Sequence, residues 1–192
     1  MTGDLFTRVI EAIDQANTAD PETVEDGGET RPAALVYGQR MSAELIRFAP
    51  QASEPLRVAV RGQHIERWKM PRASYPEGRQ GYLEWRRDLG RYHAQRVAEI
   101  MAAVGYPQAD CERTAQIVRK EGIKRDPDVQ TLEDVACLVF MRWYFAGFAE
   151  GRDRDHVRHI VGRTARKMSA AGRADALEQF DLPSDLVPVL AD

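Results

Sequence analysis

Polar side chains able to do acid–base or metal chemistry interrupt the apolar faces of several predicted helices. His64, preceded by Gln63, falls on the inner face of one helix, and His93 lies within the apolar stripe of another. Imidazole and carboxylate groups are common ligands of Mn, Fe, Ni and Zn. One hypothesis is therefore a divalent metal site formed by His64, His93, Asp134 and Glu121.

Each of these residues also has a structural explanation. A single histidine on an apolar face is usually a core residue with one hydrogen-bonded nitrogen. Asp134 fits a capping box that begins at Thr131, and Glu121 fits a helix end in solvent. Because each buried, unpaired polar group is unfavourable by itself, we expect these side chains to converge, either on a metal or in one hydrogen-bonded pocket.

Cationic and aromatic side chains alternate in the segment from residue 67 to residue 92. Guanidinium groups bind phosphate or carboxylate through paired hydrogen bonds, and aromatic faces stack on bases or cations. We interpret the segment as a lid over an anionic substrate. The alternative is a solvated loop whose arginines pair with nearby acids. The residues expected to take part are Arg67 and Arg86 in catalysis, and Gln63, Trp68, Arg72, Trp85 and Tyr37 in substrate binding.

The elements that must position these residues are predicted to be helical throughout. Periodic apolar residues predict about six to seven helices, and the segment 18–32, rich in acids and glycine, is predicted to be a loop. The predicted helices span 4–17, 33–48, 54–67, 82–104, 109–121, a buried one at 131–150, and a basic one from 155. We therefore expect an all-α fold in one compact domain, residues 1–192, with a core of about 33–150 and a C-terminal basic helix and tail at 151–192.

Composition narrows the function classes. The net charge of −3 gives no overall attraction to nucleic acid or anionic lipid, so specific nucleic-acid binding is not expected. No apolar run is long enough to cross a membrane. Cys111 and Cys137 fit buried thiols better than a disulfide. We therefore expect a cytoplasmic enzyme or binding domain. The sequence is compatible with a homodimer.

The order of elements resembles the HD-domain superfamily, which consists of all-α metal-dependent phosphohydrolases. The stretches that carry the resemblance are LVYGQRMSAELIRFAP, LRVAVRGQHI, YHAQRVAEIMAAVGYP and QTLEDVACLVF. The resemblance implies an HD-like bundle with Asp134 as the distal ligand and His93 as an auxiliary one. Tyr37 replaces the first histidine of the superfamily, and Gln63-His64 replaces its His-Asp pair.

A second resemblance covers most of the chain. The run from YGQRMS through QHIERW, GYLEWR and LEDVACLVF is similar to an uncharacterised family of bacteria and fungi that carries a domain-of-unknown-function label. This resemblance implies relatives but no activity.

Two functions fit these residues. The first is a divergent HD-like metal-dependent hydrolase acting on a phosphorylated small molecule or nucleotide, with His64 or His93 as general base if no metal binds. The second is a non-catalytic module that senses an anionic metabolite or nucleotide in the same pocket. The departures at Tyr37 and Gln63 favour the second, but the hydrolase is our primary expectation and the binding module is the alternative.

Overall fold

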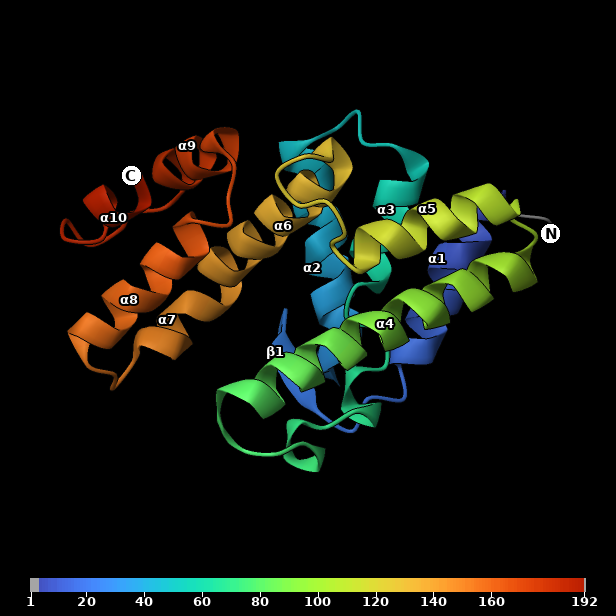
Figure 1. The fold of residues 1–192 in the computed structure, drawn as a ribbon, viewed down its shortest axis with the longest axis horizontal. Coiled ribbons are helices and arrows are strands. Elements are labelled where there is room, and N and C mark those ends of the chain that lie inside the picture. Colours follow the sequence, from blue (N-terminus) through green and yellow to red (C-terminus); the bar gives the residue numbers. More distant parts are fainter. Residues whose placement is uncertain (1–3, 192) are drawn as a thin grey trace.

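The computed structural model describes residues 4–191, and helices dominate it (Figure 1). The N-terminal part contains α1 (Leu5–Asn17), a hairpin of β1 (Thr23–Asp26) and β2 (Glu29–Pro32), α2 (Ala33–Phe48), α3 (Glu54–Gly62), α4 (Gly78–Val104) and α5 (Gln108–Val118). The C-terminal part contains α6 (Pro127–Val139), α7 (Phe145–Ala149), α8 (Arg154–Ala165), α9 (Ala170–Gln179) and α10 (Val187–Ala191). The prediction of an all-α class is confirmed, apart from the hairpin.

The hairpin corrects the prediction of a loop over residues 18–32. Its antiparallel register pairs Val24 with Arg31, and its two-residue turn is Gly27-Gly28. Both glycines have positive φ, 63° and 86°, as a tight hairpin turn requires. The strands are four residues long and polar, so they carry no apolar alternation that periodicity analysis detects.

Helix boundaries agree with local capping chemistry. Ser53 caps α3 as predicted, and its Oγ accepts a hydrogen bond from the amide of Leu56 at 3.3 Å. The predicted capping box at Thr131 is wrong, because α6 begins earlier, at Pro127, with Asp126 as its cap. Asp134 therefore lies within the helix and is buried.

Two predicted helices are interrupted. The buried helix predicted over 131–150 consists of α6, a π-helical turn at Phe140–Tyr144, and α7. The C-terminal basic helix divides into α8 and α9. In addition, α3 stops at Gly62, and the chain passes through a turn with Glu66 in the left-handed region, φ 51°. This early stop places Gln63 and His64 in a turn, where Gln63 is buried and His64 is partly exposed.

Two packed layers of helices flank α2 and α6. In Figure 1, α1, α3, α4 and α5 lie on one side, and α7 to α10 lie on the other. The larger core cluster joins α2 through α6 around Met41, Leu56 and Leu132, while Leu138, Met168 and Leu190 pack α6 against the C-terminal helices. The candidate site lies where residues of α2, α4 and the α3–α4 connection face α6 and the π-helical turn.

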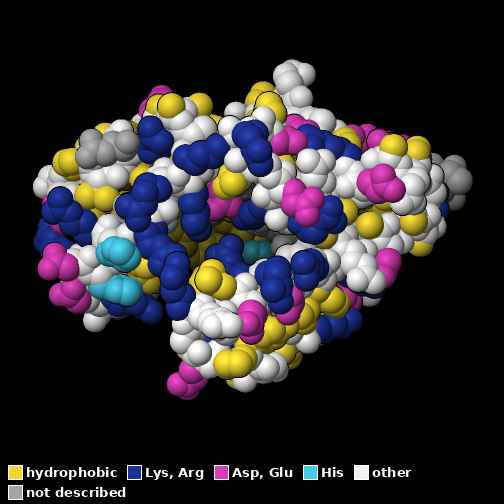
Figure 2. All heavy atoms as spheres, viewed as in Figure 1, with side chains coloured by type: hydrophobic (Ala, Val, Ile, Leu, Met, Phe, Trp, Pro, Cys, Tyr) yellow, Lys and Arg dark blue, Asp and Glu magenta, His cyan; other side chains and the backbone are white. Residues whose placement is uncertain are grey.

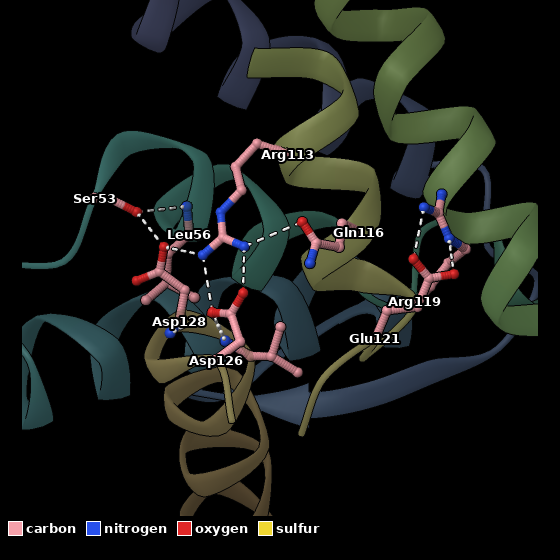
Figure 3. A network of polar contacts seen from close by, with 9 residues as sticks. Ser53, Leu56, Arg113, Gln116, Arg119, Glu121, Asp126 and Asp128 are labelled. Atoms are coloured by element: carbon pink, nitrogen blue, oxygen red, sulfur yellow. Dashed lines mark hydrogen bonds and ion pairs between the residues drawn. The ribbon is translucent and has the colours of Figure 1, made fainter. Parts of the chain in front are cut away.

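An arginine clamp fixes the start of α6 relative to α3 and α5 (Figure 3). Arg113 on α5 donates to Asp126 at 2.9 Å and to Asp128 at 2.8 Å, and Asp128 also accepts a hydrogen bond from the Ser53 hydroxyl at 3.0 Å. The Arg113 guanidinium lowers the pKa of Asp126 to about 2. The clamp sets the position from which α6 runs past the site.

None of the helices within residues 4–191 combines the length and apolar character that a membrane crossing demands.

Candidate anion-binding site

His64 lies at the centre of the site, in the turn after α3. Its ring stacks on Tyr37 of α2 with centroids 4.4 Å apart and planes 14° apart. The Tyr37 hydroxyl accepts a hydrogen bond from Gln63 Nε2 at 2.7 Å. The fold therefore brings Tyr37 of α2 into contact with the adjacent pair Gln63 and His64, 26 residues further along the chain.

His93 approaches from α4, and its ring centroid is 5.9 Å from that of His64. Its Nδ1 lies 2.7 Å from the carbonyl oxygen of Ile65. Because a carbonyl only accepts hydrogen bonds, Nδ1 carries the proton and donates it. The other nitrogen, Nε2, is buried and has no hydrogen-bond partner within residues 4–191.

Both imidazoles are neutral near pH 7. Burial lowers the pKa of His93 to about 4, and the positive charge of Arg67 contributes in the same direction. Burial also lowers the pKa of His64 well below its usual range, as do Arg67, His93 and Lys120. The rings therefore offer lone pairs and do not add to the positive charge around them.

A cationic hollow of about 300 Å³ opens beside the two rings. The charged residues that line it are Arg67, Arg86, Arg119 and Lys120. Figure 2 shows Lys and Arg side chains around a depression between α4 on one side and α6 and α8 on the other. Arg119 and Lys120 pair with Glu121 and Glu133, so the charge that suits an anion is mainly that of Arg67 and Arg86.

An aromatic hollow of about 780 Å³ adjoins the cationic one. Its aromatic lining comes from Tyr37, His64, Trp68, Trp85, Phe140 and Tyr144. Phe140 and Tyr144 belong to the π-helical turn, a feature often found at functional sites. His64, Arg67 and Trp85 line both hollows, so one ligand can occupy the two together.

The arginines of segment 67–92 divide into paired and unpaired groups. Arg87 pairs with Asp88 at 2.9 Å, and Arg72 donates to the carbonyls of Tyr75 and Pro76 at 3.0 and 2.8 Å. Arg67, in contrast, faces the Trp85 ring at 4.9 Å, and burial lowers its pKa. Arg86 contacts the Tyr82 hydroxyl at 3.3 Å. The alternative of arginines paired with nearby acids thus describes Arg87, whereas Arg67 and the exposed Arg86 have no carboxylate partner within residues 4–191.

The proposed metal ligands do not assemble. Asp134 faces α9, where its carboxylate accepts hydrogen bonds from the Ser169 amide at 2.7 Å and from Gln130 at 3.1 Å. Glu121 is exposed and pairs with Arg119 at 2.7 Å (Figure 3). Within residues 4–191, no three His, Cys, Asp or Glu side chains lie close enough to hold a metal ion.

The chemistry around His64 and His93 also disfavours a cation. Arg67, Arg86 and Lys120 line the same hollow as the two rings, and positive charges oppose metal binding. The other predicted site residues line one or both hollows, whereas Asp134 and Glu121 line neither.

Sequence reasoning missed Glu133 and Lys120. Glu133 is buried and forms ion pairs with Lys120 and, at 3.6 Å, with Lys167. Burial raises its pKa, but the two lysines outweigh this and keep the pKa below its usual value. Because α6 is buried almost all round, its apolar pattern does not indicate that Glu133, and not Asp134, pairs with Lys120 of the cationic hollow.

Comparisons with known proteins give a family but no named relative. No curated protein and no solved structure matches the chain. The model of one family, described as Domain of unknown function (DUF4202), matches residues 7–190. The chain therefore belongs to the DUF4202 family.

Proposed function

We propose that this protein binds a phosphorylated small molecule with a planar apolar part, such as a nucleotide. The phosphate occupies the cationic hollow, and the planar part lies in the aromatic hollow against Tyr37 and Trp85. Each hollow has a volume within the usual range of small-molecule pockets, about 300 to 1,000 Å³. The observation that carries the proposal is that the two hollows share His64, Arg67 and Trp85.

Arg67 and Arg86 give the proposal its anion chemistry. Neither forms an ion pair with a carboxylate among the described residues, although other arginines of the same segment do. Burial of Arg67 disfavours its charged form, so a bound phosphate would offset an existing cost. A guanidinium–phosphate hydrogen bond contributes about 1.5 to 3 kcal/mol.

The proposal includes a divergent HD-like scaffold. In that interpretation Tyr37, Gln63-His64 and His93 stand where the superfamily has metal ligands. Their mutual contacts support a site that kept its position while its ligand chemistry changed. The non-catalytic binding module is accordingly our preferred function.

Binding measurements test the proposal. Isothermal titration with adenosine 5′-monophosphate, adenosine and inorganic phosphate separates the two parts of the ligand. We expect the monophosphate to bind best, and Arg86→Gln to weaken it about tenfold or more. Arg87→Gln is the matched control, because Arg87 is the next residue and pairs with Asp88.

Equal affinities in Arg86→Gln and Arg87→Gln would refute the placement of the phosphate. A wider panel of nucleotides and sugar phosphates extends the test, and failure of every member to bind would refute the function itself.

Hydrolysis is a second candidate, favoured by the neutral imidazole of His64. Burial is the main reason that His64 stays unprotonated. A neutral imidazole beside a bound phosphate can accept a proton from an attacking water molecule. Phosphate release from the same panel, measured with added Mn²⁺ or Zn²⁺ and with a chelator, tests both the metal-dependent and the metal-independent form. No release under any condition would leave binding alone.

A further inference from the structure

A third hollow lies among the C-terminal helices. It measures about 480 Å³, and residues from three helices and one turn line it. The lining residues are Lys124, Gly162, Ala165, Arg166, Arg173 and Val189. It shares no residue with the aromatic or the cationic hollow.

The charged groups of this C-terminal hollow are all cationic. Lys124 comes from the turn between α5 and α6, Arg166 from the end of α8, and Arg173 from α9. No Asp or Glu side chain lines the hollow. Cations from three separate segments repel one another, and a bound anion removes this repulsion.

Neighbouring cations, in contrast, have carboxylate partners. Arg154, on the same helix as Arg166, pairs with Asp185 at 2.6 Å, and Lys167 pairs with Glu133. Arg173 donates to the carbonyl of Met168 at 3.3 Å, which holds its side chain without neutralising its charge. The charge at the hollow is therefore not compensated within residues 4–191.

One turn supplies a lysine to each anion site. Residues 119–126 carry Lys120, which lines the cationic hollow, and Lys124, which lines the C-terminal hollow. Both lysines have left-handed backbone conformations, φ 58° and φ 68°, which non-glycine residues adopt infrequently. The same backbone path thus presents two lysines at separate hollows.

We propose that the C-terminal hollow is a second anion site, distinct from the site of the proposed function, and that it binds a phosphate group. Arg166 and Arg173 supply guanidinium donors that match two phosphate oxygens each, and Lys124 adds a point charge. Val189 and Ala165 give the hollow an apolar wall, which accommodates the carbon side of a phosphate ester.

Titration of the full-length protein with inorganic pyrophosphate tests this site. We expect wild-type protein to bind two equivalents, and Lys124→Gln/Arg166→Gln to retain one and weaken the other about tenfold or more. Arg125→Gln is the matched control, because Arg125 is exposed, adjacent to Lys124 and absent from the hollow. These side chains are exposed, and the substitutions leave the core intact.

The proposals for the two sites can be refuted independently of each other. If Lys124→Gln/Arg166→Gln titrates like Arg125→Gln, the second site is refuted whatever happens at the first. If Arg67→Gln/Arg86→Gln binds like wild type while Lys124→Gln/Arg166→Gln loses an equivalent, the proposed function fails and the second site stands. A wild-type protein that binds no pyrophosphate, or a single equivalent lost with Arg67 and Arg86, overturns the inference.

Discussion

Replacing His93 by Asn is expected to remove a measurable part of the acid sensitivity of folding. An Asn side chain retains an N–H close to the position of Nδ1, so it still donates to the Ile65 carbonyl, while the unpartnered Nε2 is lost. The variant separates the structural hydrogen bond of His93 from its titration.

The magnitude follows from the pKa values. The imidazole has a pKa of 6.5 in the unfolded chain and about 4 in the folded protein, where the side chain is 2% exposed. Burial is the main cause, and Arg67 lowers the value further, while the Ile65 carbonyl and Glu66 oppose the shift. At about 1.4 kcal/mol per pH unit, the shift corresponds to about 3 kcal/mol.

The sign is fixed by which state binds the proton. Between pH 6.5 and pH 4 the unfolded chain protonates this imidazole and the folded protein does not, so the free energy of unfolding falls as the pH falls. We expect wild-type protein to lose about 2.5 kcal/mol more than His93→Asn between pH 7.5 and pH 4.5. His93→Asn also loses ring packing, but that loss does not depend on pH.

Urea denaturation followed by circular dichroism at a series of pH values measures this difference. His156→Asn is the control, since His156 is exposed on α8, and its curve should run parallel to that of wild type. Parallel curves for wild type and His93→Asn would refute the assignment of a neutral, buried imidazole.

Three further predictions concern packing and thiol chemistry. Gly172→Ala should destabilise the protein by about 1 to 3 kcal/mol in denaturant titrations, because the new Cβ would lie 2.7 Å from Asp134 Oδ1. Gly90→Ala, where a Cβ meets no atom within 4 Å, should stabilise α4 by about 0.5 to 1 kcal/mol, and Gly90→Leu should fold but obstruct ligand binding in the cationic hollow. Cys137, whose pKa burial raises to about 12, should react with a thiol reagent only after unfolding, as should the buried Cys111; rapid reaction of either in the native protein would contradict its placement.

Much of the helical framework is predictable because its apolar periodicity is strong. The helix at 33–48 is predicted with the boundaries that it has, and Ser53 marks the start of α3. The hairpin at 23–32 is not predictable in this way, because its short polar strands bury little apolar surface. The break at Phe140–Tyr144 is not predictable for a different reason: the residues on both sides of it are apolar, so the helical pattern continues across it.

The sequence predicts which residues line the site better than it predicts what kind of ligand the site binds. His64 and His93 are selected by their positions on apolar faces and Tyr37 by the HD-domain resemblance, and the three rings do lie together in the structure. Spacing does not give the rotation of a fully buried helix, so it selects Asp134 where Glu133 faces the lysines. Sequence also does not reveal which cations already have carboxylate partners, and that difference separates an anion site from an ordinary charged surface.

The π-helical turn has a consequence for how the two sides of the molecule fit together. Its wider hydrogen-bonding pattern accommodates an extra residue within one turn, and each residue of an α-helix rotates the chain by about 100°. Deleting one residue from 140–144 would restore a regular helix and rotate everything that follows. Tyr144 would leave the aromatic hollow, and Lys167 would lose Glu133. A single extra residue thus keeps the C-terminal helices in phase with the rest of the protein.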